Sequence, residues 1–177
     1  MPLLPGDKLG PYEILVQIGE GGMGDVYKAR DTRLDRTVAI KVSKEAFSER
    51  FEREARAVAA LNHPNICTLH DVGPNYLVME CIEGTPLKGP LPIDQALKYA
   101  AQICGALDAA HKKNITHRDL KPANILVTKQ GIKLLDFGLA KVAPVVRADE
   151  ATMTMALTGK GEILGTLLYM SPEQISG

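Results

Sequence analysis

The chain has 177 residues, of which 45% are hydrophobic, which is typical of one globular domain or two small lobes. Lysine plus arginine and aspartate plus glutamate number 21 each, so the chain has no net charge that would attract nucleic acid or an anionic membrane. We therefore expect no nucleic-acid partner.

Membrane-spanning and secreted proteins are also disfavoured. No stretch approaches the ~18 consecutive apolar residues of a membrane helix, and residues 1–6 lack the basic start and apolar core of a signal peptide. Cys67, Cys81 and Cys104 show no C-x-x-C spacing, which favours free thiols in a reducing compartment. We expect a soluble, cytoplasmic chain without a membrane segment of its own, and a tether beyond residue 177 stays compatible with this expectation.

The first half of the chain predicts an antiparallel sheet. Short β-branched or alternating runs with short connections predict five strands, at residues 12–18, 25–29, 37–42, 67–72 and 76–81. One helix should interrupt them, because apolar residues recur at helical spacing after the cap residue Ser48 and before Asn62.

A glycine-rich run joins the first two predicted strands: Gly19-Glu20-Gly21-Gly22-Met23-Gly24. This G-x-G-x-x-G match is weak alone, because dinucleotide-binding domains share it. In those domains the last glycine opens a helix, and an acidic residue follows about 20 positions later. Here residues 25–29 alternate like a strand, and Lys41 stands near the place of the acid. A β-hairpin closing over phosphates fits better, because glycines let backbone N–H groups approach an anion.

Lys41 ends a strand with apolar neighbours, where a charge needs a partner. We expect an ion pair with Glu54, which lies on the inward stripe of the predicted helix. Glu52, on the same helix, is the competing partner but points further round. The pair would orient the Lys41 ammonium toward the α and β phosphates of a nucleotide.

Glycines and prolines between residues 83 and 92 mark a boundary between a strand-rich and a helical half. We expect an N-terminal lobe at residues 1–83 and a C-terminal lobe at residues 84–177. The second lobe should begin with a helix from Ile93 to about Lys113, whose apolar residues share one face.

A β-hairpin should follow this helix, with strands at residues 125–128 and 132–135 joined by a tight turn. The run His117-Arg118-Asp119-Leu120-Lys121-Pro122-Ala123-Asn124 precedes this hairpin, and Asp136-Phe137-Gly138 follows it. Both runs should lie on loops at the ends of rigid elements, where reactive groups are exposed but held in place.

The two runs contain the groups that a phosphoryl transfer needs. One carboxylate can take up a hydroxyl proton, one ammonium can neutralise a moving phosphate, and an amide with a second carboxylate can hold Mg²⁺. Five fixed residues at these offsets should arise by chance in fewer than about one chain in ten thousand. The sequence therefore predicts a phosphoryl-transfer centre.

From Tyr12 to Glu173 the chain resembles the protein kinase family, specifically the bacterial enzymes of the eukaryotic-like Ser/Thr type. The matching segments, in family order, are Ile18 to Tyr27, Ala39-Ile40-Lys41, His117 to Asn124, Asp136-Phe137-Gly138 and Gly165-Thr166 to Glu173. The resemblance implies an α+β, two-lobed fold, with a five-stranded antiparallel sheet and one helix in the N-terminal lobe and a mainly helical, incomplete C-terminal lobe. It also implies transfer of the γ-phosphate of ATP to Ser or Thr hydroxyls of protein substrates.

The resemblance also implies roles for individual residues. Asp119 would be the catalytic base, Lys121 would stabilise the transferring phosphate, and Asn124 and Asp136 would bind Mg²⁺. The residues implied to bind ATP are Ile18, Gly19, Gly21, Gly24, Val26, Ala39, Lys41, Glu54, Met79, Glu80, Ile82, Leu126 and Asp136. Among them, the apolar walls around adenine would be Ile18, Val26, Ala39 and Leu126. Met79 would guard the rear of that pocket, and the backbone of Glu80 to Ile82 would hydrogen-bond the base.

Further implications concern specificity and regulation. Lys121, together with Gly165-Thr166, resembles the Ser/Thr-specific branch. With Arg118 directly before Asp119, the chain resembles kinases in which phosphorylation orders the activation segment, because an arginine at this position can pair with the phosphate. The autophosphorylation candidates are Thr158, then Thr154 and Thr152, although each is interpreted equally well as a solvent-facing loop threonine. The chain beyond Leu139 shows little regular pattern and predicts a mobile segment. His117 and Phe137 would stack with Val58 and Leu69 in an internal column.

The sequence departs from the family pattern at its end, because it stops just past Ser171-Pro172-Glu173, where a full kinase continues with further helices. We therefore expect the apolar helix face at Leu97, Cys104 and Leu107 to be partly uncovered. A second hypothesis follows, namely a catalytically impaired nucleotide-binding module that docks to another kinase. The intact set of Lys41, Asp119, Asn124 and Asp136 favours the enzyme. A P-loop kinase is excluded because no G-x-x-x-x-G-K-[ST] occurs.

Overall fold

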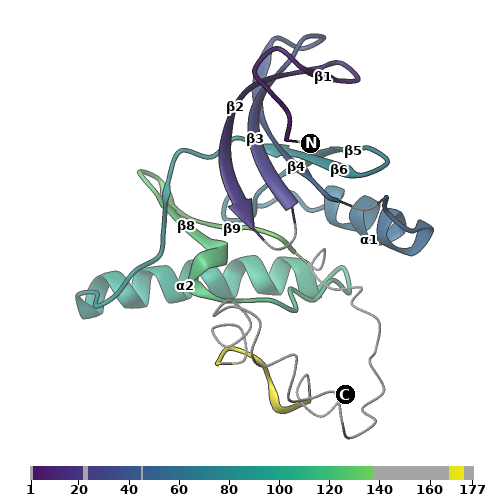
Figure 1. Ribbon diagram of the computed structural model, residues 1–177. Coiled ribbons are helices and arrows are strands. Elements are labelled where there is room, and N and C mark those ends of the chain that lie inside the picture. The colour runs from purple at the N-terminus through teal and green to yellow at the C-terminus, as the bar shows by residue number, and fades with distance from the viewer. Residues whose placement is uncertain (1, 22–23, 45, 138–167, 174–177) are drawn as a thin grey trace, which may run out of the picture.

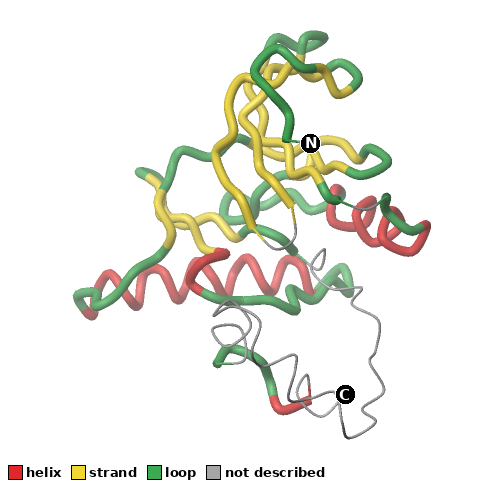
Figure 2. The backbone as a smooth tube through the Cα atoms, viewed as in Figure 1, coloured by secondary structure: helices red, strands yellow, loops and turns green. Residues whose placement is uncertain are grey.

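The computed structural model describes residues 2–21, 24–44, 46–137 and 168–173. Its strands form two separate sheets, a large one in the first half of the chain and a small one in the second, with one helix beside each (Figure 1). Figure 2 shows the long second helix running beneath the small sheet. The α+β class predicted from the sequence is confirmed.

The large sheet is antiparallel and has the strand order β1-β2-β3-β4-β6-β5. Its strands are β1 (Lys8–Leu9), β2 (Tyr12–Gly21), β3 (Gly24–Asp31), β4 (Arg36–Val42), β5 (Leu69–Val72) and β6 (Tyr76–Glu80). All five predicted strands are present. The sixth strand, β1, was not predicted, because two residues are too few to show a period. Cys67 was predicted to begin β5, but the strand begins two residues later because Ile66 forms a parallel bridge with Leu134 instead.

Alternation along the strands explains the core of this sheet. In β3, Tyr27 and Ala29 are buried, whereas the next residue, Arg30, is exposed. Successive strand residues point to opposite faces, so one face collects the apolar side chains. The resulting cluster contains Tyr12, Ile14, Tyr27, Ala29, Val38, Ile40 and Val78.

Helix α1 (Glu49–Ala59) connects β4 to β5 and packs against β5. Its cap is the one expected, since the Ser48 side chain accepts a hydrogen bond from the Phe51 amide. The inward positions Ala55 and Val58 are buried. The predicted helix is thus confirmed, and it ends before Asn62.

The small sheet has the order β7-β8-β9 and is also antiparallel. Its strands are β7 (Thr85–Pro86), β8 (Ile125–Thr128) and β9 (Gly131–Leu134). The hairpin of β8 and β9 was predicted. Its two-residue turn pairs Thr128 with Gly131, whose φ of 130° favours glycine. The strand β7 was not predicted, because it lies in the stretch rich in glycine and proline that was interpreted as a boundary between the two halves.

Helix α2 (Ile93–His111) packs against β9 and confirms the predicted helix. Ala106 and Ala110 have no exposed surface, whereas Ile93 and Leu97 are 70% and 62% exposed. Cys104 is exposed as well, and Leu107 is partly buried against the core. The expected uncovered face is therefore confirmed at Leu97 and Cys104, while Leu107 packs inward.

One core cluster extends through both halves of the molecule. It includes Ala55 of α1, Leu77 of β6, Ala106 of α2 and Ile132 of β9. Because side chains from both sides of residue 83 share this cluster, the division of the chain into lobes at that residue stays a prediction.

The loop after α1 is hydrogen-bonded to the small sheet. The Cys67 amide donates to the Leu134 carbonyl at 2.8 Å, and the Leu134 amide donates to the Asn65 carbonyl at 2.8 Å. The Asn65 side-chain amide also donates to the Ile132 carbonyl at 2.7 Å. The carboxyl end of α1 is thereby held on the second half of the molecule.

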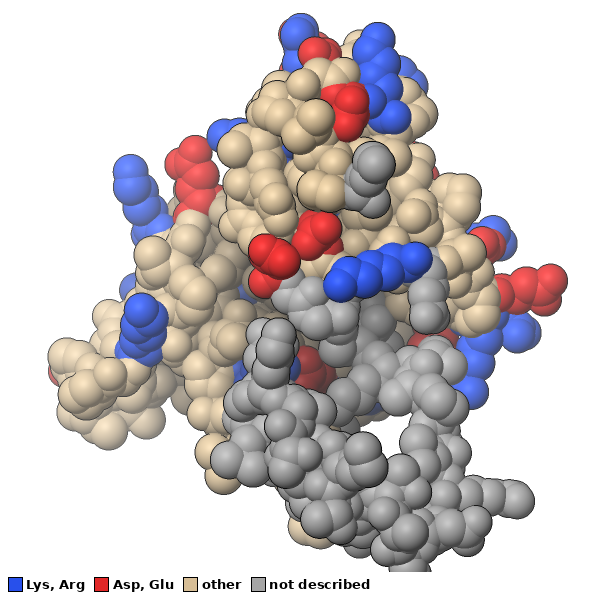
Figure 3. All heavy atoms as spheres, in the orientation of Figure 1, with Lys and Arg blue, Asp and Glu red and all other residues tan. Residues whose placement is uncertain are grey.

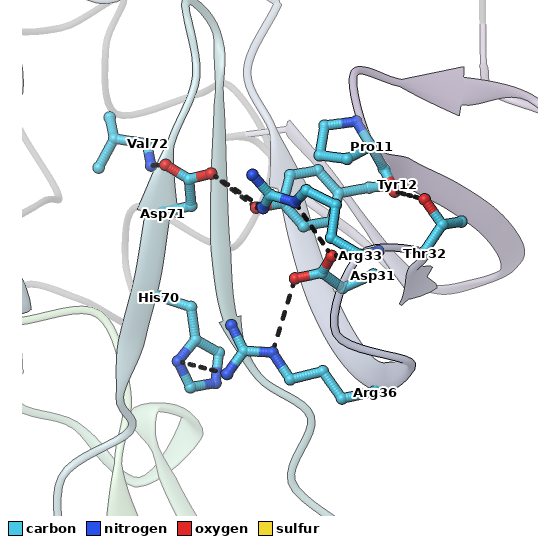
Figure 4. Close-up of polar contacts among 9 residues, drawn as sticks. All are labelled: Pro11, Tyr12, Asp31, Thr32, Arg33, Arg36, His70, Asp71 and Val72. Carbon is cyan, nitrogen blue, oxygen red and sulfur yellow. Dashed lines mark hydrogen bonds and ion pairs between the residues drawn. The ribbon is translucent and has the colours of Figure 1, made fainter.

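A polar network supports the large sheet away from this junction (Figure 4). The Asp31 side chain has no exposed surface. Its Oδ1 accepts a hydrogen bond from Arg33 Nε at 3.3 Å, and its Oδ2 forms an ion pair with Arg36 Nε at 3.6 Å. Although burial alone would raise the pKa of Asp31, the hydrogen bonds from Arg33 outweigh it and lower that pKa. The Tyr12 hydroxyl donates to Asp71 at 2.6 Å, which connects β2 to β5. The network thus joins strands that are not neighbours in the sheet.

Charged side chains of both signs are interspersed on the face drawn in Figure 3. This distribution agrees with the absence of net charge. Across the described residues, neither helix combines the length and apolarity needed to cross a bilayer.

Candidate active site

The residues expected to be catalytic lie on loops and strand ends near the junction of the two sheets. Lys41 lies in β4, Asp119 lies in the loop before the 3₁₀ turn η1 (Pro122–Asn124), and Asp136 follows β9. The Leu135 amide donates to the Asn124 carbonyl at 2.9 Å. The residue just before Asp136 is therefore hydrogen-bonded to the backbone of Asn124. The structure therefore brings together segments that are far apart in the sequence.

Asp119 is the centre of a compact polar cluster. Its Oδ2 accepts a hydrogen bond from Asn124 Nδ2 at 3.0 Å and lies 3.0 Å from Lys121 Nζ. Asn124 Nδ2 also donates to the Asp119 carbonyl at 2.8 Å. Both Asp119 and Asn124 are only 8% exposed. Both of these side-chain contacts fall on Oδ2 of the carboxylate.

The turn η1 explains this geometry. Pro122 occupies its first position, where the missing amide donor costs nothing and the fixed φ favours the turn. The Asn124 amide donates to the Lys121 carbonyl at 2.9 Å, which closes the turn. The closed turn directs the Asn124 side chain back to Asp119.

The predicted ion pair between Lys41 and Glu54 is wrong for this structure. Lys41 Nζ lies 2.9 Å from Asp136 Oδ2, and both side chains are 19% exposed. Glu54 instead contacts Arg50 Nε at 3.1 Å and Arg118 Nη1 at 3.5 Å. A poorly solvated ammonium pairs with the carboxylate that packing brings nearest, and here that carboxylate follows β9 rather than lying on α1.

The competing partner, Glu52, does not contact Lys41 either. It pairs with Arg56 at 3.4 Å, one turn along α1. The inward orientation argued for Glu54 is supported, because its side chain is 27% exposed against 38% for Glu52. The sequence therefore predicted the face of the helix but not the partner.

Arg118 and Asp136 both have backbone conformations that are unusual for residues with a Cβ. Their φ angles are 64° and 54°, in the left-handed region. Such a conformation costs about 1 kcal/mol or more and persists only where surrounding contacts enforce it. Its occurrence in both motifs is a further indication of a functional site.

His117 and Phe137 connect the two motifs. Their ring centroids are 4.6 Å apart and the ring planes are tilted by 50°, so the predicted contact is present but the rings are not stacked in parallel. Val58 and Leu69 belong to the same buried cluster as Phe137. His117 is 2% exposed, and its Nδ1 accepts a hydrogen bond from the Asp119 amide at 3.4 Å. Burial lowers the pKa of His117, so the ring is neutral near pH 7.

The glycine-rich run forms the hairpin end of β2 and β3, where Gly21 pairs with Gly24. Gly24 has a φ of 121°, and a Cβ there would lie 1.9 Å from the Val42 carbonyl oxygen, so only glycine fits. A Cβ at Gly19 would make an ordinary 3.5 Å contact with Val26. The predicted hairpin is therefore present, and Gly22 and Met23 lie outside the described residues.

The residues expected around adenine lie on adjacent strands. Val26 is opposite Lys41 in the sheet, and Ala39 is opposite Met79. Their exposure varies: Ala39 is buried, Ile18 is 52% exposed, and partly buried positions are Val26, Met79, Glu80, Ile82 and Leu126. Their binding roles stay predictions.

Asn124 and Asp136 provide a donor set that fits Mg²⁺. This ion prefers oxygen ligands and is usually held by one or two protein groups together with waters and substrate phosphates. Because Asn124 Nδ2 is bonded to Asp119, the amide Oδ1 faces the other way, where it can bind a cation. The described part of the chain contains no cluster of three His, Cys, Asp or Glu side chains that could hold a metal, and a kinase-type site does not require one.

Several predicted features lie outside the described residues. They are Gly138, Gly165, Thr166, the candidate acceptors Thr152, Thr154 and Thr158, and the segment expected to be mobile. They stay predictions.

Two contacts in this region were missed by sequence reasoning. One is the pair of Glu54 with Arg118, and the other joins Glu80 to Lys133 at 2.7 Å. Each joins residues from different elements, and no local pattern in the sequence signals such a contact.

Comparison with known proteins matches residues 12–177 to the protein kinase domain. The serine/threonine-protein kinase PrkC of Bacillus subtilis is 42% identical to this chain, over 95% of the chain and 27% of PrkC. The serine/threonine-protein kinase PknA of Mycobacterium tuberculosis is also 42% identical, over 95% of the chain and 42% of PknA. The chain thus spans less than half the length of either relative.

Solved structures give the same result. The crystal structure of the M. tuberculosis PknI kinase domain matches with a TM-score of 0.72 at 30% identity, over 79% of this chain and 63% of that domain. The likeness confirms the two-lobed architecture implied by the sequence, with an antiparallel first sheet and a second lobe of which only part is present.

Proposed function

Because this chain belongs to the protein kinase family, we propose that it is the ATP-binding and catalytic part of a Ser/Thr protein kinase, which transfers the γ-phosphate of ATP to Ser or Thr hydroxyls of proteins. The observation that carries the proposal is the cluster in which Asp119 Oδ2 contacts both Lys121 and Asn124. This cluster holds a carboxylate, an ammonium and an amide in the arrangement that the reaction needs.

In this proposal Asp119 is the catalytic base. Its Oδ2 is held by two donors, which fixes the orientation of the carboxylate, while Oδ1 accepts the proton of the attacking hydroxyl. Lys121 lies beside this carboxylate and neutralises the negative charge of the transferring phosphate. Proton acceptance and charge neutralisation therefore occur at adjacent side chains.

Lys41 and Asp136 form the second half of the proposed site. Asn124 and Asp136 would hold Mg²⁺, which neutralises phosphate charge when bound together with ATP. Lys41 would orient the phosphates. Lys41 and Asp136 are paired here at 2.9 Å, so binding of Mg²⁺ by Asp136 and of phosphate by Lys41 would replace this contact.

The finer predictions follow from this function. We propose autophosphorylation at Thr158, Thr154 or Thr152, a cytoplasmic location, and two lobes divided at residues 83 and 84. The support for them is the family membership and the motif order, rather than a contact among the described residues.

The first experiment measures phosphate transfer. Purified chain with Mg²⁺ and radiolabelled ATP should label itself or a basic protein substrate, and Asp119→Asn should reduce the initial rate by at least about 1,000-fold, since it removes the proton acceptor and a charge. The matched control is Asp108→Asn, which changes an exposed carboxylate of α2 and should leave the rate unchanged.

The same purified chain also tests the second hypothesis, a nucleotide-binding module without catalytic activity. A chain that binds ATP but transfers no phosphate, even when joined to the helical remainder of a related kinase, would contradict the enzyme and favour a nucleotide-binding module that docks to another kinase.

A further inference from the structure

A partly buried ion pair joins the two sheets at Glu80, one of the residues expected to bind the base. Lys133 Nζ lies 2.7 Å from Glu80 Oε2, and the two side chains are 20% and 32% exposed. Lys133 Nζ also lies 3.5 Å from the Ile66 carbonyl, and the Thr68 amide donates to Glu80 Oε2 at 3.3 Å. The contact therefore involves three segments: the end of β6, the middle of β9 and the loop before β5.

The positions of the two partners give this pair its importance. Glu80 is the last residue of β6, and the chain leaves the large sheet from this point. Lys133 is directly opposite Leu126 in the hairpin of β8 and β9. Glu80 is expected at the edge of the adenine ring, where its backbone would hydrogen-bond the base, and Leu126 is expected against one face of the ring. Lys133 thus contacts the residue at the edge through its ammonium and supports the residue at the face through the strand pairing.

The remaining contacts of Glu80 strengthen this connection. Its amide donates to the Thr68 carbonyl at 2.9 Å, and its carbonyl accepts a contact from Cys67 Sγ at 3.8 Å. Because the 65–67 loop is itself hydrogen-bonded to β9, Glu80 is attached to the small sheet by two routes. Of these two routes, the one through Lys133 uses an ion pair, and the one through the loop uses hydrogen bonds.

Partial burial distinguishes this pair from ordinary surface pairs. Solvent and salt screen a pair of this exposure less than a fully exposed one. The pair of Lys112 with Asp108 is a suitable comparison, because it is equally short at 2.6 Å but 74% and 63% exposed, and it lies within α2. Because its nitrogen-to-oxygen distance is similar but its side chains are more exposed, this pair is a matched control.

We propose that Lys133 is a positioning residue for the nucleotide base. By connecting Glu80 to the strand beside Leu126, it fixes the hydrogen-bonding edge of the base-binding space relative to its Leu126 wall and so contributes to affinity for the adenine part of ATP. The proposal rests on the proposed nucleotide-binding function, and it concerns binding of the base rather than the chemistry of transfer.

The first test compares two ligands in the 177-residue chain. Lys133→Met removes the ammonium but keeps the length of the side chain. It should weaken binding of Mg²⁺-ATP about fivefold, while binding of Mg²⁺-tripolyphosphate, which has no base, should stay unchanged. Lys133→Arg should restore most of the affinity, because it can still donate to Glu80. Lys112→Met should change neither ligand.

A double-mutant cycle tests the coupling between the partners. In the Lys133→Met background, the additional change Glu80→Gln should have little further effect on ATP affinity, because the pair is already broken. Independent, additive losses from the two changes would overturn the inference, and so would equal losses for ATP and tripolyphosphate.

A readout without nucleotide separates this inference from the proposed function. Lys133→Met should accelerate amide hydrogen exchange in peptides covering residues 66–68 and 78–82, whereas Lys112→Met should not. Unchanged exchange in both peptides would overturn the inference, whether or not the chain binds ATP. If the unmodified chain binds no ATP while Lys133→Met accelerates exchange, the proposed function and the role in base binding both fail, and the Glu80–Lys133 contact is structural alone.

Discussion

At the scale of single residues, the charges of the candidate site are paired in a way that differs from the proposed catalytic arrangement. Lys41 is held by Asp136 and Arg118 by Glu54. In both pairs the cation has a carboxylate partner, which offsets part of the cost of its partial burial.

His117 provides a pH-dependent contribution to stability. Burial lowers the pKa of His117, so the folded chain disfavours a proton that the unfolded chain takes up near pH 6.5. Stability should therefore be complete above about pH 6.5, fall as the pH drops through that value, and level off below the folded pKa of His117. Urea unfolding followed by circular dichroism at pH 7.5 and pH 5.5 should show the lower free energy of unfolding at the acidic pH.

The source of this pH dependence is checked by substitution. His117→Gln should reduce the difference between the two pH values, while His111→Gln, at an exposed position, should leave it unchanged. Because burial also lowers the pKa of His70, part of the difference should persist in His117→Gln. If His117→Gln retains the full difference, the buried imidazole is not its source.

At the scale of elements, α1 is attached to the rest of the molecule at both ends. After its last residue, the chain is hydrogen-bonded to β9 at Asn65 and Cys67, and Lys113 donates to the Ala60 carbonyl. At its beginning, the Phe47 amide donates to the Pro74 carbonyl at 2.7 Å, and the Ser48 cap is an exposed contact.

Ser48 should stabilise the beginning of this helix. Ser48→Ala removes the acceptor for the Phe51 amide and should lower the free energy of unfolding by about 1 kcal/mol. Ser48→Asp keeps an acceptor at the same position and adds a favourable charge at the helix start, so it should restore the stability. Urea unfolding of the three proteins makes the comparison, and equal losses in both variants would contradict a capping role.

At the scale of the whole molecule, the buried core and the exposed apolar face lie on different sides of α2. Ala106 and Ala110 join the core shared by both sheets, whereas Ile93 and Leu97 are largely exposed. Exposed apolar side chains grouped on one helix promote association between copies in solution.

Leu97 should contribute to association but not to folding. Leu97→Lys should reduce self-association, measured by sedimentation velocity, and change the free energy of unfolding by less than about 0.5 kcal/mol, because the side chain is 62% exposed. Ala106→Lys, on the buried side of the same helix, should unfold the chain because it places an unpaired charge in the core. A loss of stability in Leu97→Lys comparable to that of Ala106→Lys would show that the Leu97 side is buried in solution.

The sequence by itself determined the motifs and all the elements but the two-residue strands β1 and β7, because these features depend on local properties. The period of apolar residues predicted β3 and α1, Ser48 marked a helix start, and the spacing from Asp119 to Asn124 predicted the polar cluster that η1 closes. In each case the residues that carry the signal lie within a few positions of one another, so a local pattern is sufficient.

Only the tertiary structure decided which charges meet. Lys41 has carboxylates available on α1 and after β9, and it contacts Asp136, which is 95 residues away in the sequence. The pair of Glu80 with Lys133 and the parallel bridge of Ile66 with Leu134 are likewise contacts between distant segments. Side-chain chemistry makes each of these groups require a partner, but the identity of the partner depends on the packing of whole elements, to which every part of the chain contributes.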